Sequence, residues 1–246
     1  MATIHCKAVE FQDIQVVLFD KDGTLARSEQ YLRHLGQKRT RLIDAQIPGV
    51  QDPLLMAFGL EGDRINPAGL MAVGSRHDNE IAAAAYVAET GRDWIEALAI
   101  VRSSFAEADT VFQRKADNTP IMPDMIPLLD QLMAANLKVG IVSSDTTDQV
   151  QDFIERYDLT EYITVALGCE SLPSKPAPDL ALKACQGLGI APAQAIIIGD
   201  SRADIEMAKA ACTAGSIGVT WGWSRSVALP GATAIATQVS DLRISP

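Results

Sequence analysis

The sequence predicts an α/β protein with a parallel sheet and a helical insertion between the first two strong strands. Four short apolar runs, each ending at polar or glycine residues, alternate with segments whose apolar residues recur at helical spacing. This alternation is typical of a parallel sheet with helices on both faces, whose strands are apolar throughout. One long interval without a comparable strand separates the first run from the second, and it is the predicted insertion.

Six segments are predicted to form the sheet. The four strongest are short apolar runs with several β-branched residues, a composition that favours strands. They span 14–20, 137–143, 195–200 and 216–220. Weaker versions of the pattern occur at 162–166 and 233–236. Helical spacing of apolar residues predicts helices at 125–136, 148–157, 179–188 and 204–211.

The interval 26–118 is predicted to be an all-helical domain, inserted into a core made of residues 1–25 and 119–246. One expected helix begins after a Ser28 cap and runs to about residue 45, and two more span 79–90 and 94–115. Proline and glycine residues interrupt the middle of the interval.

Bulk properties limit the possible partners. The 246 residues suffice for one large domain or two modest ones, and 48% of them are apolar, enough to fill a sizeable core. The formal net charge of −10 argues against a general nucleic-acid-binding or anionic-membrane surface. An acidic protein that binds a phosphate needs a local positive charge, from a metal ion, a lysine or helix N-termini.

Cysteine usage and the N-terminus indicate a location. The four cysteines are scattered, with no close pair, which favours buried or partly buried thiols in a reducing compartment. Residues 1–11 lack the basic start and apolar stretch of a secretory signal. No apolar run approaches the roughly 20 residues that span a bilayer. We therefore expect a cytoplasmic protein without a membrane partner; the sequence indicates no oligomeric state.

Polar side chains gather where the predicted strands end, which is where ligands of open α/β sheets bind. Together with one lysine in a Ser-Lys-Pro turn, they are Asp20, Asp22, Ser143, Ser144, Asp200, Asp204 and Lys175. Carboxylates bind a hard cation such as Mg²⁺, whereas hydroxyls and an ammonium bind phosphate oxygens. A carboxylate can also attack phosphorus and form an aspartyl phosphate. The set therefore indicates phosphoryl chemistry.

Four segments resemble, in order, the motifs of the haloacid dehalogenase superfamily. Residues 19–25, FDKDGTL, are similar to its DxDGT motif, and residues 199–204, GDSRAD, to its GDxxxD motif. Between them lie the strand that ends in Ser143 and the basic Lys175. Residues 220–223, TWGW, resemble a segment of phosphoglycolate-phosphatase-like members. The resemblance implies a Rossmann-like parallel-sheet core, a type 1 helical cap formed by the insertion, and a Mg²⁺-dependent phosphatase.

The resemblance also implies roles for the reacting groups. Asp20 is the expected nucleophile, at the end of a buried strand that fixes its position. Asp22 is the expected acid that protonates the leaving oxygen, and then the base that helps to deprotonate water. Lys175 is expected to neutralise charge on the phosphoryl group, and on Asp20 before attack.

The remaining residues are expected to bind phosphate or metal. Ser143, the amide of Ser144 and the backbone amide of Gly23 are the expected phosphate contacts, and Gly23 also allows a tight turn. By resemblance, Mg²⁺ is expected to be held by Asp200, by a carboxylate oxygen of the nucleophile and by the backbone carbonyl of Asp22. The expected role of Asp204 is to support these metal ligands.

Each residue also has a purely structural interpretation. A strand-end aspartate such as Asp200 can be only the N-cap of the next helix. Ser143 can be only a turn residue, and Lys175 only a solvated loop residue. The three histidines are expected at the surface, and the three tryptophans are expected to serve packing. For Asp20 and Asp22 together, before Gly-Thr, the catalytic interpretation is preferred.

Other functions stay open. A phosphomutase uses the same core and differs in its cap and in the lifetime of the aspartyl phosphate. A dehalogenase is disfavoured because it needs no acid at Asp22. Phosphonate hydrolysis requires a cap lysine poised for a Schiff base, and neither Lys38 nor Lys115 is marked out for that role. A non-catalytic phosphate-binding regulatory module is disfavoured because both Asp20 and Asp22 are present.

The expected substrate is phosphoglycolate or a small sugar phosphate. Lys21 stands where phosphoglycolate-type members usually have an apolar residue. The segment 26–28 lacks the acidic residue that commonly precedes the serine. Both departures weaken a specific substrate assignment. Arg76 is a candidate for binding an anionic part of the substrate, although a solvated loop residue is the preferred interpretation.

Overall fold

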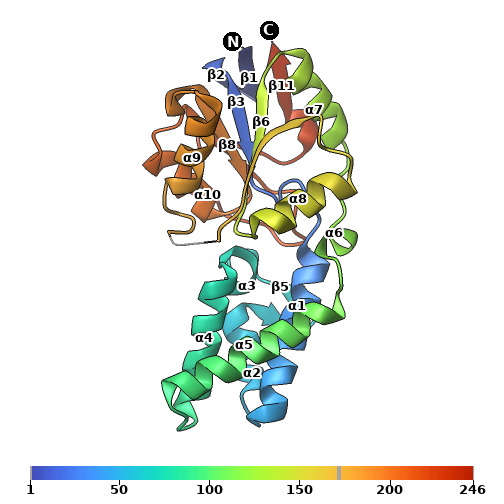
Figure 1. Cartoon of the computed structure of the whole chain (residues 1–246). Helices are drawn as coiled ribbons and strands as arrows, with labels where there is room; N and C mark the ends of the chain where they lie inside the picture. Colours follow the sequence, from blue (N-terminus) through green and yellow to red (C-terminus); the bar gives the residue numbers. More distant parts are fainter. Residues whose placement is uncertain (1, 171–172, 246) are drawn as a thin grey trace. The chain divides into compact units, whose positions relative to one another are not determined.

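The computed structural model describes residues 2–170 and 173–245, and the chain divides into two compact units (Figure 1). Met1–Ser28 and Thr119–Pro246 form the first, here called the core unit. Glu29–Asn118 form the second, here called the helical unit. The chain therefore leaves the core unit once and returns to it once.

A parallel sheet of six strands runs through the core unit in the order β10-β9-β8-β3-β6-β7. The strands are β3 (Val16–Phe19), β6 (Lys138–Val142), β7 (Ile163–Leu167), β8 (Ala195–Gly199), β9 (Gly215–Val219) and β10 (Ala234–Ala236). All six predicted segments are confirmed as strands. Every residue of β3 and β8 is buried, as continuous apolar runs indicate. The strand that leads to Asp20 is therefore one of the two middle strands of the sheet.

Four helices cover this sheet, two on each face (Figure 1). They are α7 (Met125–Ala134), α8 (Thr147–Arg156), α9 (Asp179–Leu188) and α10 (Arg202–Ala210). On one face, α9 and α10 bury Ala181, Ala184 and Met207 in the same apolar cluster as Val16 and Leu18 of β3. On the other face lie α7 and α8. The predicted α/β core is confirmed.

A three-stranded antiparallel sheet also belongs to the core unit, and the sequence analysis did not predict it. In it, β1 (Ala2–Cys6) pairs with β2 (Val9–Ile14) on one side and with β11 (Leu242–Ser245) on the other. The first strand of the parallel sheet is therefore the third strand of the chain, which corrects the predicted order. The buried and half-buried residues of β1 alternate over only five positions, and one partner lies at the far end of the chain. A local pattern this short is a weak signal.

The helical unit contains the three predicted helices and three shorter ones. They are α1 (Glu29–Gln46), α2 (Gln51–Phe58), α3 (Leu70–Val73), α4 (Arg76–Glu89), α5 (Trp94–Val111) and α6 (Lys115–Asn118). α5 packs against α1 and α4, and Phe105 of α5 meets Phe58 of α2 edge to face. Pro53 lies in the first turn of α2, where a missing N–H leaves no helical bond unmade.

The helical unit departs from the all-helical prediction at one place. β4 (Leu60–Glu61) and β5 (Arg64–Ile65) form a two-stranded hairpin. Gly62 takes a φ of 62° in its turn, a conformation that glycine adopts at little cost. Strands of two residues are too short for a periodic pattern, so the sequence showed only the turn.

The two connections to the helical unit lie side by side in the core unit. Ala26 forms an antiparallel bridge with Ile121. On either side of it, the N–H of Arg27 donates to the carbonyl of Pro120 at 2.8 Å, and the N–H of Met122 donates to that of Leu25 at 2.7 Å. The insertion therefore begins and ends at one short ladder.

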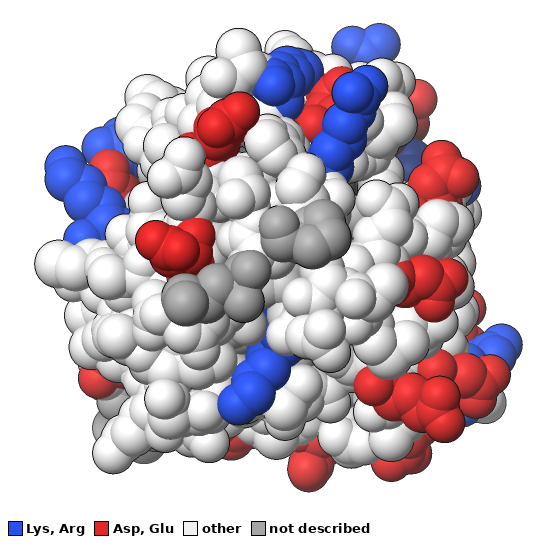
Figure 2. Space-filling view, turned by 90° about the horizontal axis from the view of Figure 1, so that it is seen from above, with Lys and Arg blue, Asp and Glu red and all other residues white. Residues whose placement is uncertain are grey.

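Charge and hydropathy set the character of the surface. None of the described helices is both long and apolar enough to cross a membrane. On the face seen in Figure 2, acidic side chains gather at one side, while lysine and arginine side chains are scattered. Among the residues coloured there, this face therefore offers a polyanion no extended basic area. The four cysteines are free thiols; Cys6 and Cys185 are buried and Cys169 is half-buried, as predicted, whereas Cys212 is exposed.

Candidate active site

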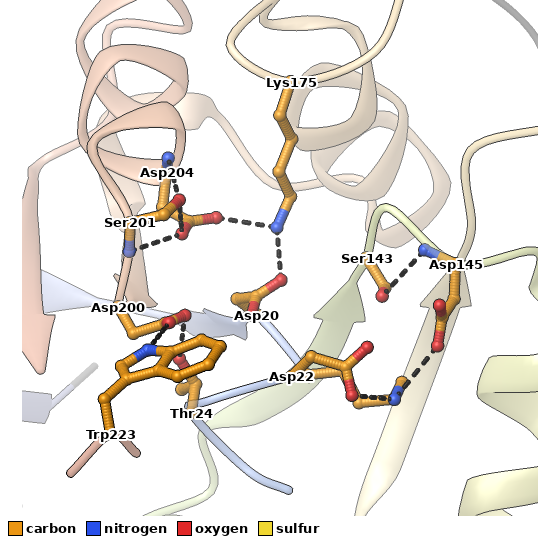
Figure 3. Close-up of polar contacts among 11 residues, drawn as sticks. Asp20, Asp22, Thr24, Ser143, Asp145, Lys175, Asp200, Ser201, Asp204 and Trp223 are labelled. Atoms are coloured by element: carbon orange, nitrogen blue, oxygen red, sulfur yellow. Dashed lines mark hydrogen bonds and ion pairs between the residues drawn. The ribbon is translucent and has the colours of Figure 1, made fainter. Parts of the chain in front are cut away.

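The carboxyl ends of neighbouring strands bring the predicted site residues together (Figure 3). Asp20 follows β3, and its N–H donates to the carbonyl of Ile198 in β8 at 2.8 Å. Ser143 follows β6, and its N–H donates to the carbonyl of Leu167 in β7 at 3.0 Å. Asp200 directly follows β8. Because these bonds continue the strand ladders, the backbone fixes the side chains at one edge of the sheet.

Three carboxylates form a buried acidic cluster, here meaning Asp20, Asp200 and Asp204. One carboxylate oxygen from each lies within 4.8 Å of the others. Burial raises the pKa of Asp20 to about 6; Asp204 and Asp22 also raise it, while Lys175 lowers it. Burial and the same cluster charges hold the pKa of Asp200 well above its ordinary value.

A divalent cation bound in the acidic cluster would offset the repulsion among its three carboxylates. The donors of the acidic cluster are hard oxygen atoms, which Mg²⁺ and similar ions prefer. Burial, together with the neighbouring carboxylates, raises the pKa values of Asp20 and Asp200, and a bound cation would stabilise their charged forms. The residues present therefore fit a hard metal ion.

Lys175 supplies one positive charge to the acidic cluster. Its Nζ donates to Oδ1 of Asp20 at 2.5 Å and to Oδ1 of Asp204 at 2.6 Å. Only 3% of its side chain is exposed, which rules out a solvated loop lysine. Burial lowers the pKa of Lys175, but the two carboxylates outweigh burial and raise it above the ordinary value. The ammonium is therefore held in its charged form beside the predicted nucleophile.

Asp204 joins the acidic cluster to a helix. Its Oδ2 accepts from the N–H of Ser201 at 3.1 Å and from its hydroxyl at 2.5 Å. The hydroxyl of Ser201 in turn accepts from the N–H of Asp204, which completes a capping box at the start of α10. Because one oxygen caps the helix and the other binds Lys175, Asp204 orients the lysine toward Asp20.

Two tryptophans donate hydrogen bonds to residues of the site, a role that the sequence analysis missed. The indole N–H of Trp223 donates to Oδ2 of Asp200, whose Oδ1 accepts from the Thr24 hydroxyl at 3.2 Å. The indole N–H of Trp221 donates to the carbonyl of Thr24 at 2.9 Å. The available signal was their place just after β9, at the same edge of the sheet as the aspartates.

Glycines make the close approach of this loop possible. Gly23 has a φ of 82°, and a Cβ there would lie 2.3 Å from Oδ2 of Asp200. A Cβ on Gly222 would lie 1.9 Å from the carbonyl oxygen of Gly23. The N–H of Gly23, expected to bind phosphate, instead donates to the carbonyl of Ala26 at 2.9 Å. The structure thus uses this amide in the turn.

Asp22 lies apart from the acidic cluster. Its Oδ1 accepts from Nζ of Lys21 at 2.5 Å and from the hydroxyl of Ser28. Lys21 also pairs with Oδ2 of Asp145 at 3.0 Å. In Figure 3 the carboxylate of Asp22 points toward the side of Asp145 and Ser143. Its side chain is therefore no part of the acidic cluster among the described residues.

The predicted phosphate contacts lie in the loop after β6. Ser143 is buried, and its hydroxyl oxygen accepts from the N–H of Asp145 at 3.1 Å. Ser144 is half-buried beside it. The loop then enters α8 through a capping box of Thr146 and Gln149. Ser143 is thus a turn residue whose hydroxyl also lies at the edge of the site.

The raised pKa of Asp20 predicts a pH-dependent difference in stability between wild type and Asp20→Asn, measured in a chelator. The carboxyl has an ordinary pKa of 3.8 and a pKa of about 6 in the folded chain. The folded state therefore binds this proton more tightly, and the group's contribution to stability falls as pH rises from 3.8 through about 6. Asparagine does not ionise. The stability of Asp20→Asn relative to wild type should rise by up to about 3 kcal/mol between pH 4 and 7.

Denaturant unfolding at several pH values measures this difference. A difference that stays flat across this range would show that Asp20 titrates normally. Asp130→Asn, which changes an exposed aspartate on α7, should show no comparable trend and serves as the control.

A buried lysine lies with three carboxylates at the carboxyl edge of a parallel sheet, the edge at which α/β proteins bind their ligands. Residues 14–211 match the family model of the haloacid dehalogenase-like hydrolases. The phosphoglycolate phosphatase of Shigella boydii serotype 4 (strain Sb227) is 30% identical over 234 residues, which cover 89% of this chain and 86% of that protein. The chain belongs to the haloacid dehalogenase-like hydrolase family.

Further comparisons agree with this assignment. The phosphoglycolate phosphatase of Escherichia coli (strain K12) is 29% identical, over 89% of this chain and 86% of that protein. A crystal structure described as a predicted phosphoglycolate phosphatase from Haemophilus somnus 129PT matches with a TM-score of 0.67 and 19% identity, over 91% of this chain and 94% of that one. A haloacid dehalogenase-like protein from Streptococcus pneumoniae matches with a TM-score of 0.58 and 21% identity, over 92% and 95%. These structural matches show the shared fold.

Proposed function

We propose that the protein is a Mg²⁺-dependent phosphatase that hydrolyses a small phosphate monoester through an aspartyl phosphate on Asp20. The observation that supports this most is the contact of Lys175 with Asp20 inside the acidic cluster. A strand-end carboxylate held beside a buried ammonium is placed for attack on an anionic phosphoryl group. The phosphoglycolate phosphatases among the relatives support the same reaction class.

In the proposed reaction an oxygen of Asp20 attacks phosphorus while the bond from phosphorus to the leaving oxygen breaks. Asp22 first takes up a proton from solvent on Oδ2, the oxygen that does not contact Lys21, and gives it to the leaving oxygen, so the alcohol departs neutral. Asp22 then takes a proton from the water that attacks the aspartyl phosphate, which releases phosphate and restores Asp20. Lys175 and the phosphate-binding loop at Ser143 and Ser144 offset the charge of the phosphoryl oxygens.

Mg²⁺ is the metal ion proposed for the acidic cluster. Asp20 and Asp200 would hold it together with the backbone carbonyl of Asp22, and Asp204 would support them through Lys175 and Ser201. When bound, the ion supplies positive charge to the phosphoryl oxygens and neutralises buried carboxylates. The donor set favours Mg²⁺ over softer ions.

The contact of Trp223 with Asp200 predicts an effect on metal affinity. Trp223→Phe keeps the ring but removes the N–H that orients the carboxylate of Asp200. We expect Mg²⁺ to bind about tenfold more weakly, in the range seen when a group that hydrogen-bonds to a metal ligand is removed. Calorimetric titration with Mg²⁺ measures this without turnover.

Trp221→Phe is the matched control for that experiment. It removes an indole N–H in the same loop, but one that donates to the carbonyl of Thr24 rather than to a carboxylate. Its Mg²⁺ affinity should stay within about threefold of wild type. Equal losses in the two variants would contradict a specific role of Trp223 toward Asp200.

We also propose that the helical unit acts as a cap that selects the substrate. The core motifs handle a phosphoryl group that all candidate substrates share, so discrimination requires other residues. Its hinges would be Leu25–Arg27 and Asn118–Pro120, next to the short ladder that holds the two connections side by side. Arg76 is a weak candidate for the residue that selects the substrate, because its guanidinium already pairs with Glu80 and Asp109.

A screen of phosphate esters tests the proposed function. Phosphoglycolate, small sugar phosphates and aryl phosphates are supplied with Mg²⁺, and released phosphate is measured. We expect turnover with Mg²⁺, none in excess chelator, and preference for one small ester. Absence of release from every ester would contradict phosphatase activity. Conversion of a sugar phosphate to its isomer without net release would indicate a phosphomutase instead.

A further inference from the structure

Lys21 is a buried cation that the proposed reaction does not use. It lies between the two aspartates of the first motif, and only 1% of its surface is exposed. Burying an ammonium is costly unless partners compensate it. The partners of Lys21 therefore indicate what this residue does.

Three groups surround the ammonium of Lys21. Its Nζ contacts Oδ1 of Asp22 at 2.5 Å and Oδ2 of Asp145 at 3.0 Å. It also lies 5.3 Å from the centroid of the Phe153 ring, within reach of a cation–π attraction. Asp22 belongs to the first motif, Asp145 to the loop after β6 and Phe153 to α8. One ammonium thus links the predicted acid to the phosphate-binding loop.

We propose that Lys21 is a positioning residue that fixes the carboxylate of Asp22 and offsets the charge of Asp145 beside the phosphate-binding Ser143. This inference rests on the proposed function, because it assigns Asp22 the proton transfers.

The positioning effect follows from the contacts of one oxygen. Oδ1 of Asp22 accepts from both Lys21 and the hydroxyl of Ser28, and two donors on one oxygen restrict rotation of the carboxylate. Lys21 itself cannot move freely, because it is buried against Phe153 and paired with Asp145. A proton donor displaced by about 1 Å loses much of its efficiency, about 100-fold for a comparable misplacement.

The charge effect follows from the place of Asp145. Its N–H donates to the hydroxyl oxygen of Ser143 at 3.1 Å, so its carboxylate belongs to the same turn as a predicted phosphate contact. A negative charge there that Lys21 did not offset would repel every phosphate ester alike. The ammonium of Lys21 at 3.0 Å offsets it. Lys21 therefore contributes twice, to proton transfer and to phosphate binding, and the two effects can be separated.

The test uses Lys21→Met, which keeps the length of the side chain and removes its charge, with Lys138→Met as the control. Lys138 is exposed and donates to the carbonyl of Leu188. We measure kcat and KM for an alkyl phosphate and for 4-nitrophenyl phosphate. In Lys21→Met, kcat on the alkyl ester should fall about 100-fold, because its leaving group needs a proton. On the aryl ester it should fall less than about fivefold, while KM rises for both.

A double variant separates the two effects and guards against simple unfolding. Lys21→Met with Asp145→Asn removes a positive and a negative charge together, so the buried cluster keeps its net charge. We expect KM to return to within about threefold of wild type, while kcat on the alkyl ester stays low. Circular dichroism and thermal unfolding confirm that each variant is folded.

Two results would overturn the inference. One is a folded double variant whose kcat falls equally on both esters, or not at all. The other is a KM that Asp145→Asn fails to lower in the Lys21→Met background. If wild type itself releases no phosphate from either ester, the proposed function fails, and this outcome is distinct from a failure of Lys21 alone.

Discussion

Asp20→Asn should lose phosphatase activity by about 10⁴-fold or more while the protein stays folded. The amide keeps the shape of the carboxylate but lacks the negative charge that attacks phosphorus. The backbone bond to Ile198 that holds this position does not involve the side chain. Rates of phosphate release, compared with the circular dichroism spectrum of the same sample, measure both parts of the prediction.

Trapping of the intermediate makes this test specific. Wild type mixed with labelled substrate and quenched in acid should retain label on the protein, whereas Asp20→Asn should retain none. Asp130→Asn again provides the control, because Asp130 is an exposed residue that accepts from Tyr162. Near-normal turnover by folded Asp20→Asn would refute the covalent mechanism.

Lys175→Met should reduce activity about 1,000-fold and also destabilise the fold. The substitution leaves the buried carboxylates of Asp20 and Asp204 without the ammonium that now contacts both. Removing one partner of a buried ion pair costs about 3–5 kcal/mol. Denaturant unfolding in chelator measures the stability, and kinetics on alkyl and aryl phosphates measure the activity.

The pattern of losses distinguishes Lys175 from Lys21. Because the charge of the phosphoryl group is common to all esters, Lys175→Met should slow both substrates alike. Lys183→Met, on the exposed side of α9, should leave activity and stability near wild type. A Lys175→Met protein that loses activity mainly on the alkyl ester would show that this lysine assists proton transfer instead.

The elements with strong periodic patterns could be predicted from the sequence. All six strands of the parallel sheet and their four helices were found, because continuous apolar runs and helical spacing are local signals. β1, β2 and β11 were missed because each is short, and the pairing of β1 with β11 also joins residues far apart in the sequence, Thr3 with Ser245. The hairpin of β4 and β5 was missed because each strand has only two residues.

The features of the site also divide into those that the sequence predicted and those that it could not. The predicted site residues belong to motifs at the ends of predicted strands, so the sequence alone predicts that they lie at one edge of the sheet. What it could not show is which partner each side chain chooses. Trp223 was expected to serve packing, yet its indole also binds Asp200. Lys21 was noted as a departure, but its burial between Asp22 and Asp145 depends on the loop after β6.

The order of strands in the two sheets has a consequence for synthesis on the ribosome. Val16 of β3 pairs with Lys138 of β6 and with Ala195 of β8. The middle of the sheet therefore cannot form until these later segments have been translated. The helical unit is contiguous and is complete once Asn118 has emerged, which allows it to fold first. β1 gains its second neighbour last, because that neighbour, β11, spans Leu242–Ser245. A nascent chain halted before Leu242 therefore leaves one edge of β1 open to pairing with other chains, however complete its catalytic residues already are.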